Sequence, residues 1–427
     1  MSTSTRLSNK EQRLVVGEIR DWLAAQLISA EQAELLSARY PGHAQKGNIT
    51  GVVSLIGAVL VGLGTLLFIG ANWQHIAVGA KLLLIAAAIG TSYYFGWRLR
   101  YEPGTRPKLG SALLLLGGLF YGAGIWLVAQ IFNLDANFSE GLLLWAAGTA
   151  GTALVTRSVP LGCLTSVLLG MWTFARVDFN SFEHSAQFLP NFCYFMLAFT
   201  GMLGLGGFLR SRAVTWITLA FSAVWMLVIC PLHQNGLLVW AQGLFGCYLW
   251  VRRHWTIFSA PFLYMSSVST FGALLGSTFG WETNWDPGSI GILALLMFCT
   301  LATLMLVAWR DNETMLEVVG CIGIVLLGVV IGGATEGGFR VLSNTLLLSA
   351  IGGAIYTGMN RLRSPGLVNV ALVFFVFDVI ARYFDFFFSM MDRSVFFIVG
   401  GVVLMAVGAA AEGGRRKLLE TLEPKAA

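Results

Sequence analysis

Residues 110–132 read GSALLLLGGLFYGAGIWLVAQIF, an unbroken run without a charged side chain. A helix needs roughly 20 apolar residues to cross a hydrocarbon core of about 30 Å, and this run has that length. Similar runs recur along the chain of 427 residues, of which 56% are hydrophobic and only 11% are charged. Because a water-soluble fold could not bury so much apolar surface, the composition predicts an all-α, polytopic transmembrane helix bundle.

Measured against the same length, the chain divides into about fourteen spans, of which the fourth, fifth and eighth are short. The predicted spans are Gly51–Ala71, Val78–Trp97, Gly110–Phe132, Gly141–Val155, Leu161–Phe174, Pro190–Leu209, Val214–Cys230, Gly236–Val251, Phe258–Gly280, Ile290–Trp309, Met315–Gly333, Val341–Met359, Leu367–Met390 and Phe396–Ala411.

The positions of the 27 Lys and Arg residues predict an orientation. Most of them lie in the N-terminal tail, in every second connection and in the C-terminal tail, whereas the other connections hold only Lys81, Arg176, Arg340 and Arg393. Basic residues near span ends stay on the cytoplasmic side. Both termini are therefore expected in the cytoplasm, with a soluble segment at 1–49, a transmembrane domain at 50–411 and a basic tail at 412–427.

The N-terminal segment is predicted to form a short helical hairpin. Ser8 with Glu11, and Ser29 with Gln32, have the spacing of a capping box, in which a hydroxyl and a longer side chain satisfy each other's backbone N–H groups at a helix start. About 40 residues bury too little surface for an independent domain. The hairpin either docks on the membrane domain or binds a cytoplasmic protein partner through residues 8–40.

A charged triad lies inside the thirteenth predicted span. Asp378 is near the midpoint of that span, with Arg382 four residues and Asp385 seven residues further on. A charge at the centre of a spanning helix costs about 2.5–3.5 kcal/mol on insertion scales, so it needs a partner or water. Residues three and four apart share a helix face. The triad is therefore either a structural ion pair or a site that couples a proton or metal cation to transport.

Glycine, with 50 residues, is the other conspicuous feature of the composition. Small residues spaced by four let helices approach closely in lipid, as at Ala58/Gly62, Gly118/Gly122 and Gly328/Gly332. Glycines at 62–64 and 122–124 alternatively permit a helix break that lines a cavity. In that case Asn72 and Gln130, which follow these glycines, are possible cavity-lining residues.

Several short stretches resemble a known family. They are Trp22, the run 26–29 (QLIS), Glu31-Gln32, Tyr40, the run 70–74 (GANWQ) and the run 120–133 (FYGAGIWLVAQIFN). Together they resemble the bacterial predicted membrane proteins grouped as domain of unknown function 2157, over roughly residues 8–150, and residues 369–401 resemble the end of such proteins. The resemblance implies a multi-pass protein of the bacterial inner membrane and names no activity.

Motifs typical of enzymes are absent from the sequence. It has no phosphate loop of the Gly-Lys-Ser/Thr type, no Gly-x-Ser-x-Gly elbow and no His-x-x-x-His pair, and its six cysteines have no metal-ligand spacing. The dispersed basic residues reflect topology and not nucleic-acid binding. We therefore expect a protein that is not an enzyme, has no cofactor or metal and contacts the lipid bilayer.

Two classes of function fit these features. The first is a secondary transporter or permease centred on Asp378, Arg382 and Asp385, whose small-molecule or ion substrate is unknown. The second is a structural or regulatory membrane protein that recruits a cytoplasmic partner through its N-terminal hairpin. A membrane enzyme acting on lipid is a distant third.

Overall fold

The computed structural model describes residues 18–19, 22–23, 25, 27–39, 76–102, 107–134, 137–177, 185–230, 233–279, 287–310, 315–332, 337–387 and 393–420. All regular structure in these residues is helical. The chain divides into two compact units, Met1–Ala80 and Lys81–Ala427. The helices are α2 (Ala30–Arg39), α4 (Val78–Tyr101), α5 (Pro107–Ile131), α6 (Phe138–Thr156), α7 (Val159–Ala175), α8 (Ser185–Leu209), α9 (Arg212–Ile229), α10 (His233–His254), α11 (Thr256–Thr278), α12 (Pro287–Arg310), α13 (Met315–Gly332), α14 (Gly337–Asn360), α15 (Pro365–Phe387) and α16 (Arg393–Glu420).

Helix α2 belongs to the first unit and begins at the predicted capping box. The backbone N–H of Ser29 donates to Gln32 Oε1 at 3.0 Å, and the backbone N–H of Gln32 donates to Ser29 Oγ at 3.2 Å. This helix start is confirmed. The predicted partner pair, Ser8 and Glu11, lies outside the described residues, as do the first predicted span and Asn72.

Each predicted span from the second to the fourteenth coincides with one helix, α4 to α16 in order. Among the described helices, 9 are long and apolar enough to cross a membrane, and three shorter apolar helices lie at Val159–Ala175, Ile290–Leu306 and Glu317–Val330. Apolar side chains such as Leu83 (73% exposed), Phe298 (71%) and Met405 (69%) face outward. Such a surface is stable only in contact with lipid.

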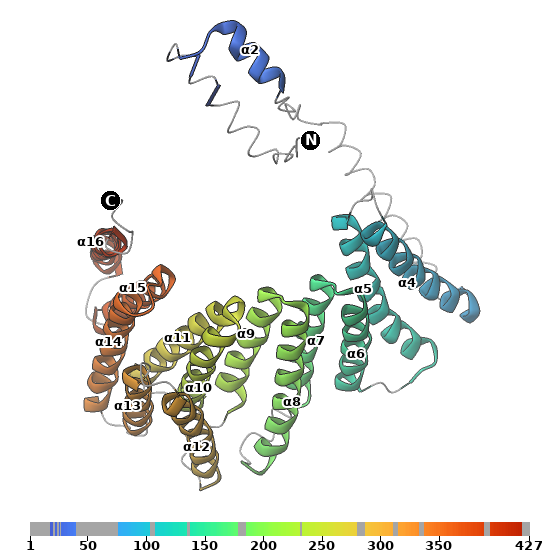
Figure 1. Ribbon diagram of the computed structural model, residues 1–427. Helices are drawn as coiled ribbons and strands as arrows, with labels where there is room; N and C mark the ends of the chain where they lie inside the picture. The colour runs from blue at the N-terminus through green and yellow to red at the C-terminus, as the bar shows by residue number, and fades with distance from the viewer. Residues whose placement is uncertain are drawn as a thin grey trace. The chain divides into compact units, whose positions relative to one another are not determined.

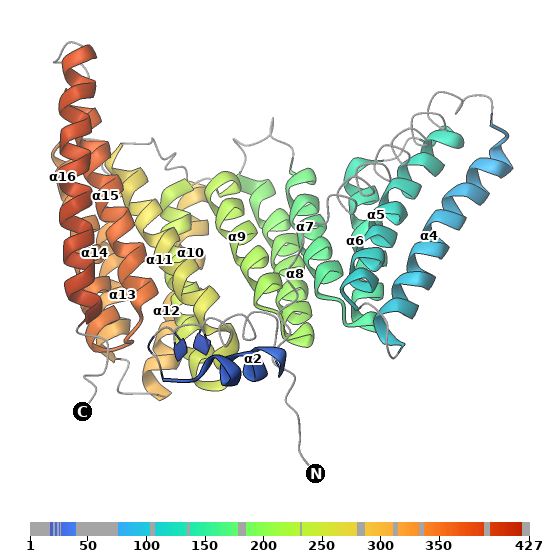
Figure 2. The same cartoon turned by 90° about the horizontal axis from the view of Figure 1, so that it is seen from above.

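The helices of the second unit follow one another from α4 to α16 (Figure 1) and run side by side along their length (Figure 2). Contacts between non-consecutive helices join α7 to α9, α9 to α11, and α11 to both α14 and α15. Helix α10 packs against α9, α11, α12 and α13. The largest apolar core therefore lies in α8 to α15, where for example the rings of Phe195 and Trp225 stack at 4.2 Å.

Three helix-to-helix connections share one design, an Arg in the left-handed conformation followed by a Ser. Arg157, Arg210 and Arg363 have φ angles of 42°, 48° and 45°. Ser211 and Ser364 then accept hydrogen bonds, both 3.4 Å, from backbone N–H groups three residues on. Arg157 and Arg210 directly follow the last residues of α6 and α8, whereas Arg363 lies between the end of α14 at Asn360 and the start of α15. Ser211 and Ser364 thus cap α9 and α15, while Ser158, before α7, makes no side-chain capping hydrogen bond.

The predicted role of glycine in packing is visible in α5. A Cβ added at Gly122 would lie 2.0 Å from Trp145 Cε2, and Trp145 Nε1 donates to the Gly118 carbonyl at 2.8 Å. Glycine is needed here because an aromatic ring occupies the space of a side chain. The alternative prediction of a helix break at residues 122–124 is wrong, since α5 continues unbroken through them.

Candidate functional site: a buried carboxylate network and a polar cavity

Asp378 lies on the inner face of α15. It shares that face with Leu367, Val368 and Ala371, which are buried. Its exposed fraction is only 2%, unusually low for a carboxylate. Asp378 is buried because its position in the helical repeat places it on the same face as these apolar residues. A buried carboxylate requires hydrogen-bonding or charged partners.

Arg382 supplies one of those partners. Its Nε lies 3.5 Å from Asp378 Oδ1, and its Nη1 lies 3.3 Å from Asp385 Oδ2. The two pairs that the spacing predicts are therefore present on one face of α15. Asp385 is the outer member, with 41% of its side chain exposed, against 3% for Asp378 and 19% for Arg382.

Two further helices contribute to the network. With its amide nitrogen facing Asp378, the orientation that satisfies both residues, Asn344 of α14 donates to the two carboxylate oxygens at 2.8 and 3.0 Å. Arg382 Nη2 donates to Thr278 Oγ1 of α11, and its Cζ lies 5.2 Å from the centroid of the Phe279 ring. The carboxylate and the guanidinium are thus held by α11, α14 and α15 together.

A polar cavity of ≈ 340 Å³ lies among α10, α11, α13, α14 and the start of α15. Its lining combines apolar side chains with one carboxylate, one amide and several hydroxyls. The polar members are Gln242, Ser266, Ser267, Thr270, Glu317, Ser349 and Thr357. Inside a membrane domain, such a lining is typical of a water- or ligand-accessible cavity.

Glu317 carries the only charge among the cavity-lining residues. Its side chain is 5% exposed, and its Oε1 lies 3.7 Å from Arg361 Nη1, at the end of α14. Its other oxygen, Oε2, is buried and has no hydrogen-bond partner among the described residues. A buried carboxylate oxygen without a partner costs free energy, so a hydrogen-bond donor is expected to occupy the cavity beside Oε2.

An aromatic pair lies between the cavity and the network, judged by position along the helices. The rings of Phe271 (α11) and Phe374 (α15) are 5.3 Å apart. On α11, Phe271 lines the cavity and stands seven residues before Thr278; on α15, Phe374 precedes Asp378 by four residues. The two polar regions are therefore neighbours in the same helices, separated by a layer of rings.

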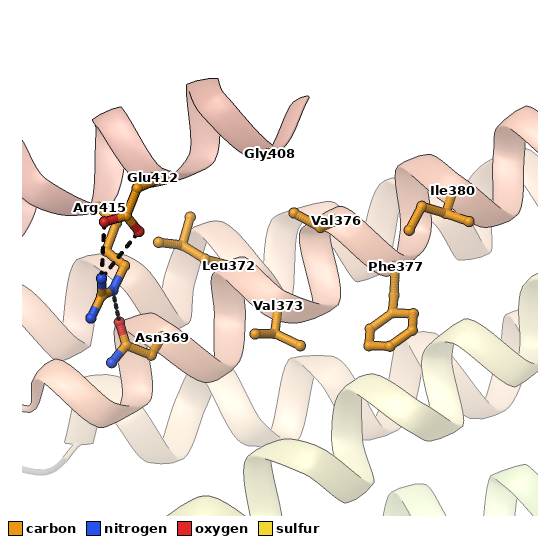
Figure 3. A pocket seen from close by; sticks show the side chains of 9 residues that line it. All are labelled: Asn369, Leu372, Val373, Val376, Phe377, Ile380, Gly408, Glu412 and Arg415. Carbon is orange, nitrogen blue, oxygen red and sulfur yellow. Dashed lines mark hydrogen bonds and ion pairs between the residues drawn. The ribbon is translucent and has the colours of Figure 1, made fainter. Parts of the chain in front are cut away.

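A second cleft, ≈ 290 Å³, lies between α15 and α16 and has a different character (Figure 3). Its polar end is closed by contacts among its own residues: Arg415 Nε donates to Asn369 Oδ1 at 2.8 Å, and Arg415 Nη1 lies 3.1 Å from a Glu412 oxygen. Glu412 is 44% exposed. It is therefore a useful comparison for Glu317, being an acid of the same type outside the polar cavity.

Of the two predicted cavity-lining residues, Asn72 lies outside the described residues. Gln130 is an exposed residue in the last turn of α5 and is not part of these regions. Within the described part of the chain, no three His, Cys, Asp or Glu side chains form a group that could hold a metal ion.

Sequence reasoning missed Glu317, Gln242, Asn344 and Thr278. Glu317 stands two residues inside a predicted span, where it reads as an interfacial acid, and the other three are uncharged. Gln242, near the middle of a predicted span, was the one available indication. The side-by-side packing of α10, α11, α13 and α14 that brings them together is a tertiary property.

Taken with the apolar outer surface, these helices define a multi-pass membrane protein in contact with the lipid bilayer. Residues 20–162 match the family model described as "Predicted membrane protein (DUF2157)", which confirms the resemblance over that region. The resemblance predicted for residues 369–401 lies beyond the match and stays a prediction. No curated protein and no solved structure matches the chain.

Proposed function

We propose that this chain is a secondary transporter or permease of the bacterial inner membrane, and that it is not an enzyme. The observation that carries the proposal is Asp378, a buried carboxylate held by Arg382 of α15 and Asn344 of α14, two helices that also contribute to the polar cavity. Intramembrane acids of this kind are typical of proton and cation pathways. In this role Asp378 binds the coupling proton or cation, and Arg382 and Asn344 hold it between turnovers.

The proposed orientation has both termini in the cytoplasm. Contacts between the Arg-bearing connections support it: Arg100 Nη2 donates to the Arg157 carbonyl at 2.9 Å, and Arg212 Nε donates to the Ile257 carbonyl at 2.8 Å. These connections thus lie on shared faces, as the positive-inside rule requires. Arg361, beside Glu317, then marks the cytoplasmic end of the polar cavity.

Water access to the cavity is the first test. Ser266 lines the cavity and is 1% exposed, whereas Ser222 of α9 is 0% exposed and is not among the cavity residues. Both hydroxyls donate to carbonyls of their own helices, and Ser222 additionally accepts from Trp240 Nε1 at 3.2 Å, so Ser222→Cys is a buried control for Ser266→Cys. In a variant without native cysteines, a small cationic thiosulfonate should label position 266 much faster than 222. Equally slow labelling of both positions would show that water does not reach the cavity, and it would contradict the proposal.

Transport itself is tested in proteoliposomes that enclose a pH dye or a sodium dye. An imposed inside-negative potential should drive proton or sodium entry through the wild-type protein. Asp378→Asn should abolish the entry, while Glu412→Gln, which alters an exposed acid on α16, should leave it intact. Entry that persists in Asp378→Asn would show that the carboxylate is not the coupling site.

The competing proposal, a regulatory protein that recruits a cytoplasmic partner, is favoured by one observation in the first unit. Large apolar side chains of the N-terminal segment are exposed: Trp22 (41%), Leu27 (73%) and Leu35 (70%). Deleting residues 8–40 separates the two proposals. A transporter should retain ion entry without the segment, whereas a regulatory protein should lose partner binding and tolerate Asp378→Asn.

A further inference from the structure

We propose that the polar cavity binds a small organic ammonium compound, which donates hydrogen bonds to Glu317 Oε2 and to the oxygens of the surrounding hydroxyls. The proposal names a substrate class for the transporter proposed above and in that sense rests on it. Binding of the ligand, however, does not require transport, and the two can be tested separately.

The first argument is the charge of the cavity. Glu317 is the single ionisable acid or base among its lining residues apart from the thiol of Cys321. Arg361 approaches Oε1 and leaves the buried Oε2 without a hydrogen-bond partner in the described residues. This oxygen is negatively charged and needs a hydrogen-bond donor. A ligand with a positive charge and N–H groups supplies both the opposite charge and the donor.

The second argument is the direction of the hydroxyl protons. Each lining hydroxyl donates its one proton to a carbonyl of its own helix: Ser266 and Ser267 to Leu263, Thr270 to Ser266, Ser349 to Thr345, and Thr357 to Gly353. The Gln242 amide nitrogen in turn donates to Thr270 Oγ1 at 2.7 Å. The hydroxyls therefore act on the cavity as acceptors, through their remaining lone pairs.

The third argument concerns size and apolar character. A volume of ≈ 340 Å³ is at the lower end of the range of about 300–1,000 Å³ for small-molecule pockets. Phe245, Phe271, Ile324 and Leu346 provide apolar lining, and the two aromatic rings are of the type that attracts organic cations. A partly apolar cavity that offers acceptors and an unpartnered carboxylate oxygen favours an alkylammonium over an anion or a sugar.

The test is a titration of the purified full-length protein in detergent, at low salt, with thermal unfolding as the readout. The probes are n-butylammonium chloride, 1-butanol, sodium butyrate and sodium chloride. Butanol tests the effect of the alkyl chain alone, butyrate that of a negatively charged head group, and sodium chloride that of an inorganic cation. We expect a saturable rise in melting temperature with butylammonium alone, because a ligand that binds only the folded state stabilises it.

Two variants locate the effect. Glu317→Gln keeps the shape of the side chain and removes its charge, so the apparent affinity for butylammonium should fall at least tenfold. Glu412→Gln, the exposed acid of the α15–α16 cleft, should leave the affinity unchanged. If Glu317→Gln does not fold, Ser349→Ala, which removes one acceptor and keeps the charge, should weaken binding severalfold.

Three outcomes would overturn the assignment. They are equal stabilisation by butanol, equal stabilisation by sodium chloride, and unchanged butylammonium affinity in Glu317→Gln. Ion entry into proteoliposomes without ammonium binding would support the transporter proposal and contradict the ammonium ligand. Ammonium binding without ion entry would support the binding site and contradict the transporter proposal.

Discussion

Helices α5–α7 and helices α10–α15 are both built from predominantly apolar sequence, yet their interiors differ. In α5–α7 the indole of Trp145 covers Gly122, and Thr165 of α7 donates to Thr149 of α6 at 3.1 Å. In α10–α15 the packing leaves a cavity that Glu317 lines, and the buried Asp378 lies further along α15. On the proposals above, the first region holds helices together, whereas the second also binds a ligand or an ion.

The region that resembles the family and the candidate site lie in different parts of the chain. The family match at residues 20–162 covers α2, α4, α5, α6 and the start of α7, while Glu317 and Asp378 lie well beyond it. Both acids and the largest apolar core therefore belong to a part of the chain for which the match provides no information.

The largest expected effect is that of Arg382→Gln. It leaves Asp378 buried beside Asn344 with no cation within reach, which should destabilise the protein by about 3 kcal/mol or more. Asp378→Asn should cost less, and the double variant should recover at least 1 kcal/mol, roughly the interaction energy of residues in contact. Denaturant unfolding in detergent measures the cycle. Additive costs would show that the pair does not interact.

Asn344→Leu tests the third member of the network. Removing two hydrogen bonds to a charged group should cost about 1.5–3 kcal/mol in the same unfolding assay. In an Asp378→Asn background the charge is absent, so the same substitution should cost distinctly less. An equal cost in both backgrounds would mean that Asn344 stabilises α14 by packing alone.

Gly122→Ala examines the packed region for contrast. The new methyl group must displace the Trp145 ring, and the resulting overpacking should cost about 1–3 kcal/mol. Gly151→Ala is the matched control, because a Cβ there meets nothing within 4 Å and should be neutral or slightly stabilising. Gly122→Ala should also leave ion entry and butylammonium affinity unchanged. A loss of either would connect α5–α7 to the site.

The smallest expected effect is that of Thr165→Val in α7. It removes the hydroxyl pair with Thr149 and keeps the side-chain volume, so it should cost about 0.6 kcal/mol, the average for hydrogen bonds between membrane helices. Thermal unfolding should shift slightly and ligand affinity should not change. A cost as large as that of Asn344→Leu would erase the distinction between the two regions.

Sequence reasoning succeeded where local physics decides. Apolar run length located thirteen of the predicted spans on helices α4–α16, and the capping box at Ser29 and Gln32 located the start of α2. The Asp378–Arg382 pair was predictable because residues four apart share a helix face. Asn344 and Thr278 were not predictable, because uncharged polar residues on other helices become partners only through packing.

The sequence by itself thus determined the class of protein, because the length of each apolar run can be compared directly with the number of helical residues needed to cross a bilayer. It also determined that an acid stands at the middle of α15. Only the tertiary structure decided what surrounds that acid, that Glu317 enters a cavity, and that Gln242 meets Thr270. These contacts join separate helices, and in lipid the close fit of side chains, not hydrophobicity, selects which helices meet.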